Sequence, residues 1–149
     1  MQIVYQGVRS NGVSVPVAVS APGIFTQTQT GSGAGAIINQ DGTVNSAANP
    51  AAKGSVIAIY ATGEGQTIPS GINGKVNNDG TLPRPVLPTT VTIDGQPAEV
   101  TYAGGAPDLV SGALQVNARV PAGAASGTVA VVVTVGTNSS QAGVTLFVQ

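Results

Sequence analysis

The sequence contains no cysteine, no histidine and no tryptophan. Without cysteine the fold cannot depend on disulfides or thiolate metal sites. Because histidine is absent as well, the usual nucleophile–base pairs and zinc sites are excluded. Aromatic residues are limited to three tyrosines and two phenylalanines, fewer than carbohydrate-binding sandwiches usually present to sugar rings. We therefore expect a non-enzymatic protein with no metal and no cofactor.

Charge is scarce: 7% of the residues are charged, and five basic and six acidic side chains give a net charge of -1. There is no basic patch for nucleic acid, and no apolar run is long enough for membrane insertion. The first residues show no signal peptide. The lack of cysteine and the excess of small polar residues over lysine and glutamate indicate an extracellular or cell-surface location. Export would then be directed by something outside this sequence, or Met1 lies inside a longer protein.

Glycine (21) and proline (10) are abundant, while 42% of the residues are hydrophobic and mostly β-branched. This composition is typical of an all-β protein with many turns. The strongest signal runs from Gly127 to Gln149, where apolar residues alternate on both sides of a polar turn and predict a β-hairpin with one apolar face. That face must meet another sheet, because a lone hairpin is only marginally stable. Its residues are Val129, Val131, Val133, Val135, Val144, Leu146 and Val148.

Further short strands are expected on both sides of Asp41-Gly42 and of Asp94-Gly95, two dipeptides that favour hairpin turns. Residues 55–63 suit a central strand, and residues 114–120 alternate between apolar and polar. About seven strands with a turn every ten residues or so predict an immunoglobulin-like β-sandwich over residues 22–149. Residues 64–88 hold many turn signals and no period, so they should form a long excursion from the sandwich.

Residues 1–21 predict an extra N-terminal β-hairpin, with strands at 2–6 and 13–19. Its pattern resembles that of residues 127–149, so it is either the terminal hairpin of a preceding, absent immunoglobulin-like unit or a pair of donated strands. The valines of its second strand alternate on one face. They must be buried on this domain's own sheet edge or in another subunit by strand addition. These valines are Val13, Val15, Val17 and Val19.

Five blocks of the sequence resemble the signature blocks of an uncharacterised C-terminal domain family first catalogued in Solibacter proteins. The blocks keep their order and cover nearly the whole chain. Domains of this family typically close large exported bacterial proteins, are similar to IPT/TIG immunoglobulin-like modules, and have no assigned catalytic residues. The resemblance thus implies architecture and location but no activity. The blocks are residues 21–25, 49–55 with 61–63, 84–85, 91–98 and 115–121.

Two functional hypotheses follow. The first is a non-enzymatic extracellular structural or interaction module whose partner is a protein, with self-association through the N-terminal hairpin into a fibre or oligomer by strand exchange. Its interaction residues would be the four valines of 13–19 and Phe147, which alternates out of phase with the apolar face of its strand. The alternative is a carbohydrate-binding or adhesion module that contacts polysaccharide through Tyr60 or Tyr102.

Three chemical sites are weaker alternatives. Glu64 and Asp79 could form the carboxylate pair of a glycoside hydrolase, although solvated loop acids are the better explanation for them. Residues 77–80, Asn-Asn-Asp-Gly, offer oxygens to calcium but also suit a turn. Lys53 and Asn117 could form an isopeptide bond assisted by Glu99, yet both look like ordinary surface positions.

Overall fold

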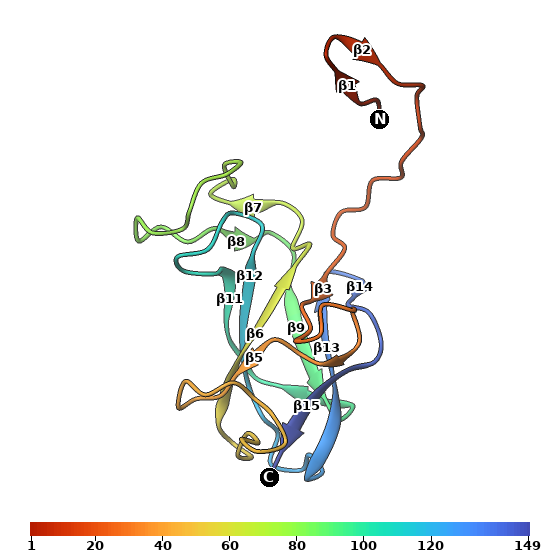
Figure 1. Cartoon of the computed structure of the whole chain (residues 1–149). Helices are drawn as coiled ribbons and strands as arrows, with labels where there is room; N and C mark the ends of the chain where they lie inside the picture. The colour runs from red at the N-terminus through yellow and green to blue at the C-terminus, as the bar shows by residue number, and fades with distance from the viewer.

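Two mainly antiparallel sheets face each other in the computed structural model, which describes residues 1–149 (Figure 1). The first sheet has the order β10-β9-β13-β15-β4, with β14 beside β13, and the second has the order β11-β12-β6-β3, with β5 beside β6. No helix has the length and hydropathy needed to cross a membrane. The strands are β1 (Val4–Tyr5), β2 (Val8–Arg9), β3 (Gly23–Ile24), β4 (Gly33–Ala34), β5 (Ile37–Ile38), β6 (Val56–Thr62), β7 (Thr67–Ile68), β8 (Arg84–Pro85), β9 (Thr89–Ile93), β10 (Gln96–Ala98), β11 (Val100–Gly105), β12 (Leu114–Arg119), β13 (Gly127–Val135), β14 (Asn138–Ser139) and β15 (Val144–Val148).

The strand order is that of an immunoglobulin-like sandwich, as the sequence predicted. Strands β3, β6, β12 and β11 take the places of A, B, E and D in one sheet, and β10, β9, β13 and β15 take those of C′, C, F and G in the other. The short strand β4 extends the sheet that contains β15 by pairing with it in parallel. The segment that carries β3 and β4 therefore contributes to both sheets of the sandwich.

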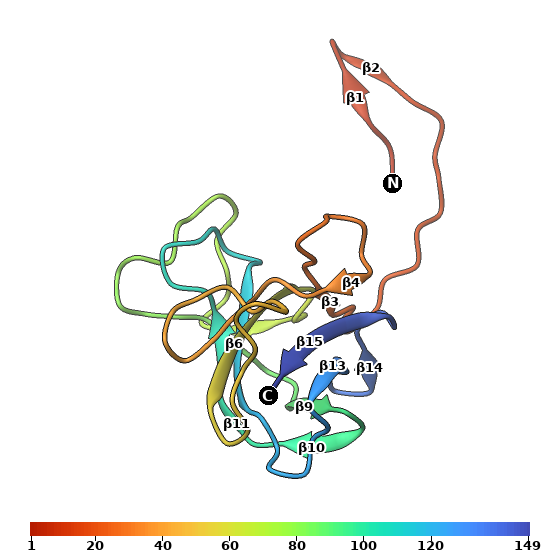
Figure 2. The ribbon, with the colours of Figure 1, turned by 60° about the horizontal axis from the view of Figure 1, so that its bottom comes forward.

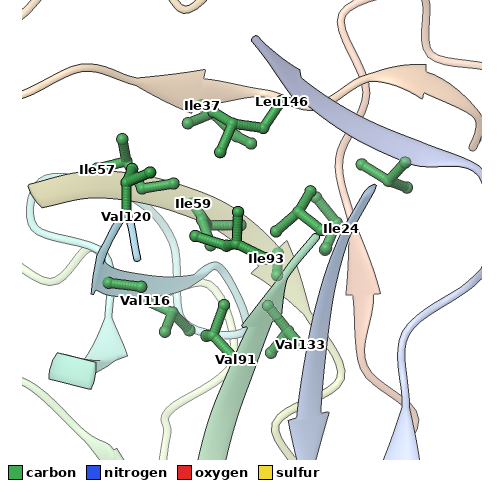
Figure 3. Packing of buried hydrophobic residues seen from close by; sticks show 14 of the residues in the cluster. Ile24, Ile37, Ile57, Ile59, Val91, Ile93, Val116, Val120, Val133 and Leu146 are labelled. Atoms are coloured by element: carbon green, nitrogen blue, oxygen red, sulfur yellow. The ribbon is translucent and has the colours of Figure 1, made fainter. Parts of the chain in front are cut away.

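The space between the sheets is filled by aliphatic side chains (Figure 3). The apolar face predicted for residues 127–149 is confirmed, because all seven of its residues are buried. They meet inward-facing residues of β6 and β12, such as Ile57, Ile59 and Val116, which are fully buried. Burying one such side chain contributes roughly 1.5–3 kcal/mol, so this layer holds the two sheets together.

The hairpin turn at Asp94-Gly95 is also confirmed. Both residues have positive φ, 53° and 71°, and they join β9 to β10 through a two-residue turn. Around Asp41-Gly42 the chain turns as expected, with Gly42 at a φ of 84°. The strand expected after this turn is reduced to a single bridge between Ile38 and Val44.

The N-terminal hairpin differs from its predicted form. Gln6 and Gly7 have φ values of 49° and 79°, so the chain reverses at this tight turn and pairs Val4 with Arg9 and Tyr5 with Val8. The predicted second strand is absent, because the short hairpin uses residues 8–9. Only Val13 keeps a backbone partner, Met1, and residues 14–19 have none. Figures 1 and 2 show the hairpin well away from the sandwich, joined to it by the extended segment of chain that follows β2.

The 64–88 excursion carries a small sheet of its own, β7 with β8. The loop between these strands is tied to the loop between β11 and β12 by backbone hydrogen bonds, in which Asn77 N donates to Leu109 O and Ser111 N donates to Lys75 O. The side chain of Asn77, which belongs to this loop, is buried and donates a hydrogen bond to Ala106 O. The excursion is thus a folded cap on one end of the sandwich, despite its lack of sequence periodicity.

Two side-chain amides occupy the free edges of strands where no further strand pairs. Asn45 accepts a hydrogen bond from Phe147 N at 2.8 Å and donates to Phe147 O at 2.9 Å. Gln141 does the same at β3, accepting from Ile24 N and donating to Ile24 O. Each amide stands in for the peptide group of a missing neighbouring strand, so these edge positions are not left open.

Replacement of Asn45 by alanine should lower the free energy of unfolding by about 1–3 kcal/mol, because it leaves the Phe147 N–H without a partner at a half-buried edge. Urea unfolding of the variant measures this. Asn78→Ala is the matched control, since Asn78 is exposed and its side chain makes no hydrogen bond, and should change stability by less than about 0.5 kcal/mol. Equal stability of the two variants would contradict the structural role of the amide.

Candidate functional site

Residues 1–19, called the N-terminal arm below, expose an unusual amount of apolar surface. The four valines predicted to form an interaction face, Val13, Val15, Val17 and Val19, have exposed fractions of 56%, 50%, 96% and 69%. The backbone of residues 14–19 makes no hydrogen bond to any other part of the chain. The arm therefore presents both aliphatic side chains and unpaired peptide groups to solvent.

The arm joins the sandwich at a firmly held residue, Ser20. This residue is 3% exposed, and its hydroxyl donates to Val135 O at 2.8 Å. The side-chain amide of Asn138 donates to Ser20 O at 2.9 Å, and Ala21 N donates to Gly63 O. The direction in which the arm leaves the domain is consequently set by the folded core.

Two glycines allow this junction to form. Gly63 and Gly65 have positive φ, 79° and 75°. A Cβ atom on Gly63 would lie 1.9 Å from Ala21 O, and one on Gly65 would lie 2.1 Å from Val19 O. Because a side chain at either position would strike the backbone, both must be glycine for the arm base to pass over the end of β6.

An apolar groove runs beside the base of the arm. Val17, Ala18 and Val19 line one part of it, and Val86 and Leu87 line another, around a volume of about 520 Å³. We call this the arm-base groove. It adjoins a second hollow under the excursion, since both are lined by Gly65, Gln66 and Val86.

This second hollow, the polar cleft, has a volume of about 660 Å³ and is lined mainly by polar residues. Glu64 lies in its wall with only 7% of its surface exposed, and its Oε2 atom is buried without a hydrogen-bond partner. The hydroxyl of Ser111, in the same wall, is buried and unpaired as well. A buried carboxylate without a partner is costly, so the cleft holds acceptor groups that a ligand could satisfy.

Phe147, the fifth predicted interaction residue, lies elsewhere. It is half-buried on β15, paired in register with Thr128, and its backbone is held by Asn45. Its strand ends at the pole of the sandwich opposite the arm (Figure 1). The structure therefore does not bring Phe147 together with the four valines.

Tyr60 and Tyr102, the predicted sugar contacts, share the outer face of the second sheet. Tyr60 pairs with Gln115 and Tyr102 with Asn117, positions that alternate with the buried residues of β12. The guanidinium of Arg84 lies 5.1 Å from the centre of the Tyr102 ring, and the Tyr102 hydroxyl donates to Gly105 O. Arg84 thus covers one ring face of Tyr102.

The carboxylates proposed for hydrolysis lie in different hollows. Glu64 lines the polar cleft, whereas Asp79 lines a neighbouring hollow and forms an ion pair with Lys75. This ion pair, together with the Thr81 N–H, lowers the pKa of Asp79. Both carboxylate oxygens of Asp79 accept hydrogen bonds from its own loop, so residues 77–80 form a turn stabilised by this side chain. No three acidic side chains come together as a group that could hold a metal ion.

Glu99 and Asn117, two of the three residues of the isopeptide hypothesis, each contact a different partner. Glu99 forms an ion pair with Arg119 at 2.8 Å, and the Asn117 amide oxygen accepts a hydrogen bond from Gln115. No hydrogen bond joins Lys53 to Asn117. The three side chains are not assembled into a reacting group.

Sequence reasoning missed the arm base and the burial of Glu64. The available signal was the Gly63-Glu64-Gly65 spacing directly after the central strand, since two glycines around one acid indicate a close backbone approach. No protein-family model, no curated protein and no solved structure matches the chain. Membership of the Solibacter-type domain family accordingly stays a prediction.

Gly65→Ala should destabilise the protein and loosen the arm base, because the new methyl group would strike Val19 O as well as straining a positive φ. Gly74→Ala is the matched control: its φ is 76°, but nothing lies within 4 Å of the added Cβ, so only the conformational cost of about 1–2 kcal/mol applies. Hydrogen exchange of the Ala21 amide and urea unfolding measure both effects. Equal losses in the two variants would show that the close contact is unimportant.

Tyr102 should ionise above the ordinary tyrosine pKa of 10.0, because burial raises its pKa although Arg84 opposes the shift. A raised folded-state pKa means that the stability contribution is complete below about pH 10 and is lost as the pH rises through the folded-state value. Ultraviolet absorbance titration of the native protein and of Tyr102→Phe gives the Tyr102 transition by difference. A midpoint at or below pH 10 would contradict this assignment.

Proposed function

We propose that the protein is a non-enzymatic interaction module that associates with further copies of itself through the N-terminal arm. The observation that carries the proposal is the state of residues 13–19, which expose four valines and whose peptide groups are unpaired from residue 14 to residue 19. Segments that alternate β-branched residues add readily to other strands. Burial in a second copy would satisfy both the valines and the backbone.

The low charge of the chain and its lack of cysteine support a place outside the cell or on its surface. In such a setting the module would connect protein chains, and its low charge would do little to oppose close approach of identical copies. Polysaccharide binding through the outer face that carries Tyr60 is the alternative, although Arg84 already covers one face of Tyr102.

A variant in which all four arm valines are threonine should associate much more weakly than the native chain. Threonine keeps the β-branched shape but loses the apolar surface, and each buried valine contributes roughly tenfold in affinity. Sedimentation velocity over a range of concentrations measures the association. Val44→Thr is the matched control, because Val44 is 51% exposed and lies on another part of the surface.

Two results would contradict the proposal. One is a native chain that sediments as a strict monomer at every concentration. The other is an assembly whose strength is unchanged in the four-threonine variant, since association would then use a surface other than the arm.

A further inference from the structure

The polar cleft and the arm-base groove together carry one charged side chain. Among all residues that line the two hollows, Glu64 is the sole ionisable one. Neither of the two ion pairs of the protein involves it. An acidic side chain that is more than nine-tenths buried, in a cleft that also holds an unpaired Ser111 hydroxyl, favours a ligand with a positive charge and several hydrogen-bond donors.

The arm carries the matching group. Arg9 is the only charged side chain within residues 1–19, and it is exposed and takes part in no ion pair. It lies directly opposite Val4 in the β1–β2 pair, so both side chains share one face of the hairpin. A guanidinium has five N–H donors, enough to serve a carboxylate and a hydroxyl at the same time.

The arrangement of the molecule favours an exchange between two copies. Figure 1 shows the hairpin and the excursion with β7 and β8 at the same pole of the sandwich, while the hairpin itself projects away from its own domain. The connector of residues 10–19, extended at about 3.3 Å per residue, reaches about 30 Å. The arm of one copy can therefore reach the groove of another, and the second arm can return the contact.

We propose that the hairpin of one copy docks across the adjoining groove and cleft of a second copy, where Arg9 donates to Glu64 and to the Ser111 hydroxyl. Val4 and the arm valines then cover Val86 and Leu87 of the partner. Because donor and receptor lie at the same pole, the contact is reciprocal and closes as a twofold dimer instead of extending into a fibre. This inference rests on the proposed self-association and names its receptor.

The test is a double-mutant cycle on the full chain with Arg9→Gln, Glu64→Gln and the combined variant, followed by sedimentation. Glutamine matches the size of glutamate at position 64, and at position 9 it replaces an exposed arginine by a shorter neutral side chain. Thermal unfolding checks that the variants keep the native fold. Each single change should weaken the dimer about tenfold to a hundredfold, the loss typical of a hydrogen bond to a charged group. The combined variant should be no weaker than the worse single variant, because both changes remove one contact.

Lys53→Gln and Asp108→Asn are the matched controls, since each removes one exposed charge that belongs to neither ion pair; both should dimerise like the native chain. A native dimer unaffected by Glu64→Gln would overturn this receptor while leaving self-association through the arm intact. Assemblies that grow beyond two copies would overturn the closed dimer. A native chain that stays monomeric would overturn both this inference and the proposed function.

Discussion

The burial of the valine face of β13 is the interaction on which the other parts of the fold depend. The protein has no disulfide and only two ion pairs, both partly exposed, so aliphatic packing supplies most of its stability. Strand β13 pairs with β9 along one part of its length and with β15 along another. A shift of one residue would turn its valines toward solvent, so the buried face sets the register of both neighbours.

When the apolar faces of the two sheets pack together, the peptide groups at the sheet edges still need hydrogen-bond partners. Asn45 and Gln141 supply such partners at two edge positions, since each side-chain amide offers one donor and one acceptor in the geometry of a peptide group. The arm is different. Its residues 14–19 have neither a strand nor an amide beside them, so the part of the chain outside the sandwich combines open backbone with exposed valines.

Local patterns predicted the parts of the fold that local chemistry controls. Alternation located β12, β13 and β15, and Asp94-Gly95 located a turn, because a strand facing one core repeats every two residues. The same alternation predicted a strand at 13–19, where the tight turn at Gln6-Gly7 removed the partner. The polar cleft could not be predicted in this way. The burial of Glu64 accompanies the passage of residues 19–21 over Gly63 and Gly65, a contact between segments more than forty residues apart.

The parallel pairing of β4 with β15 has a mechanical consequence. The N-terminal hairpin and the C-terminus lie at opposite ends of the molecule (Figure 1), so tension applied between the two ends of the chain runs along β15. Its edge is held by hydrogen bonds from Gly33 N to Gly143 O, from Gly35 N to Thr145 O and from Ala51 N to Phe147 O. These bonds lie across the direction of pull and share the load. We therefore expect the final strand to slide as a whole before any one of them is released, an arrangement that favours resistance to stretching.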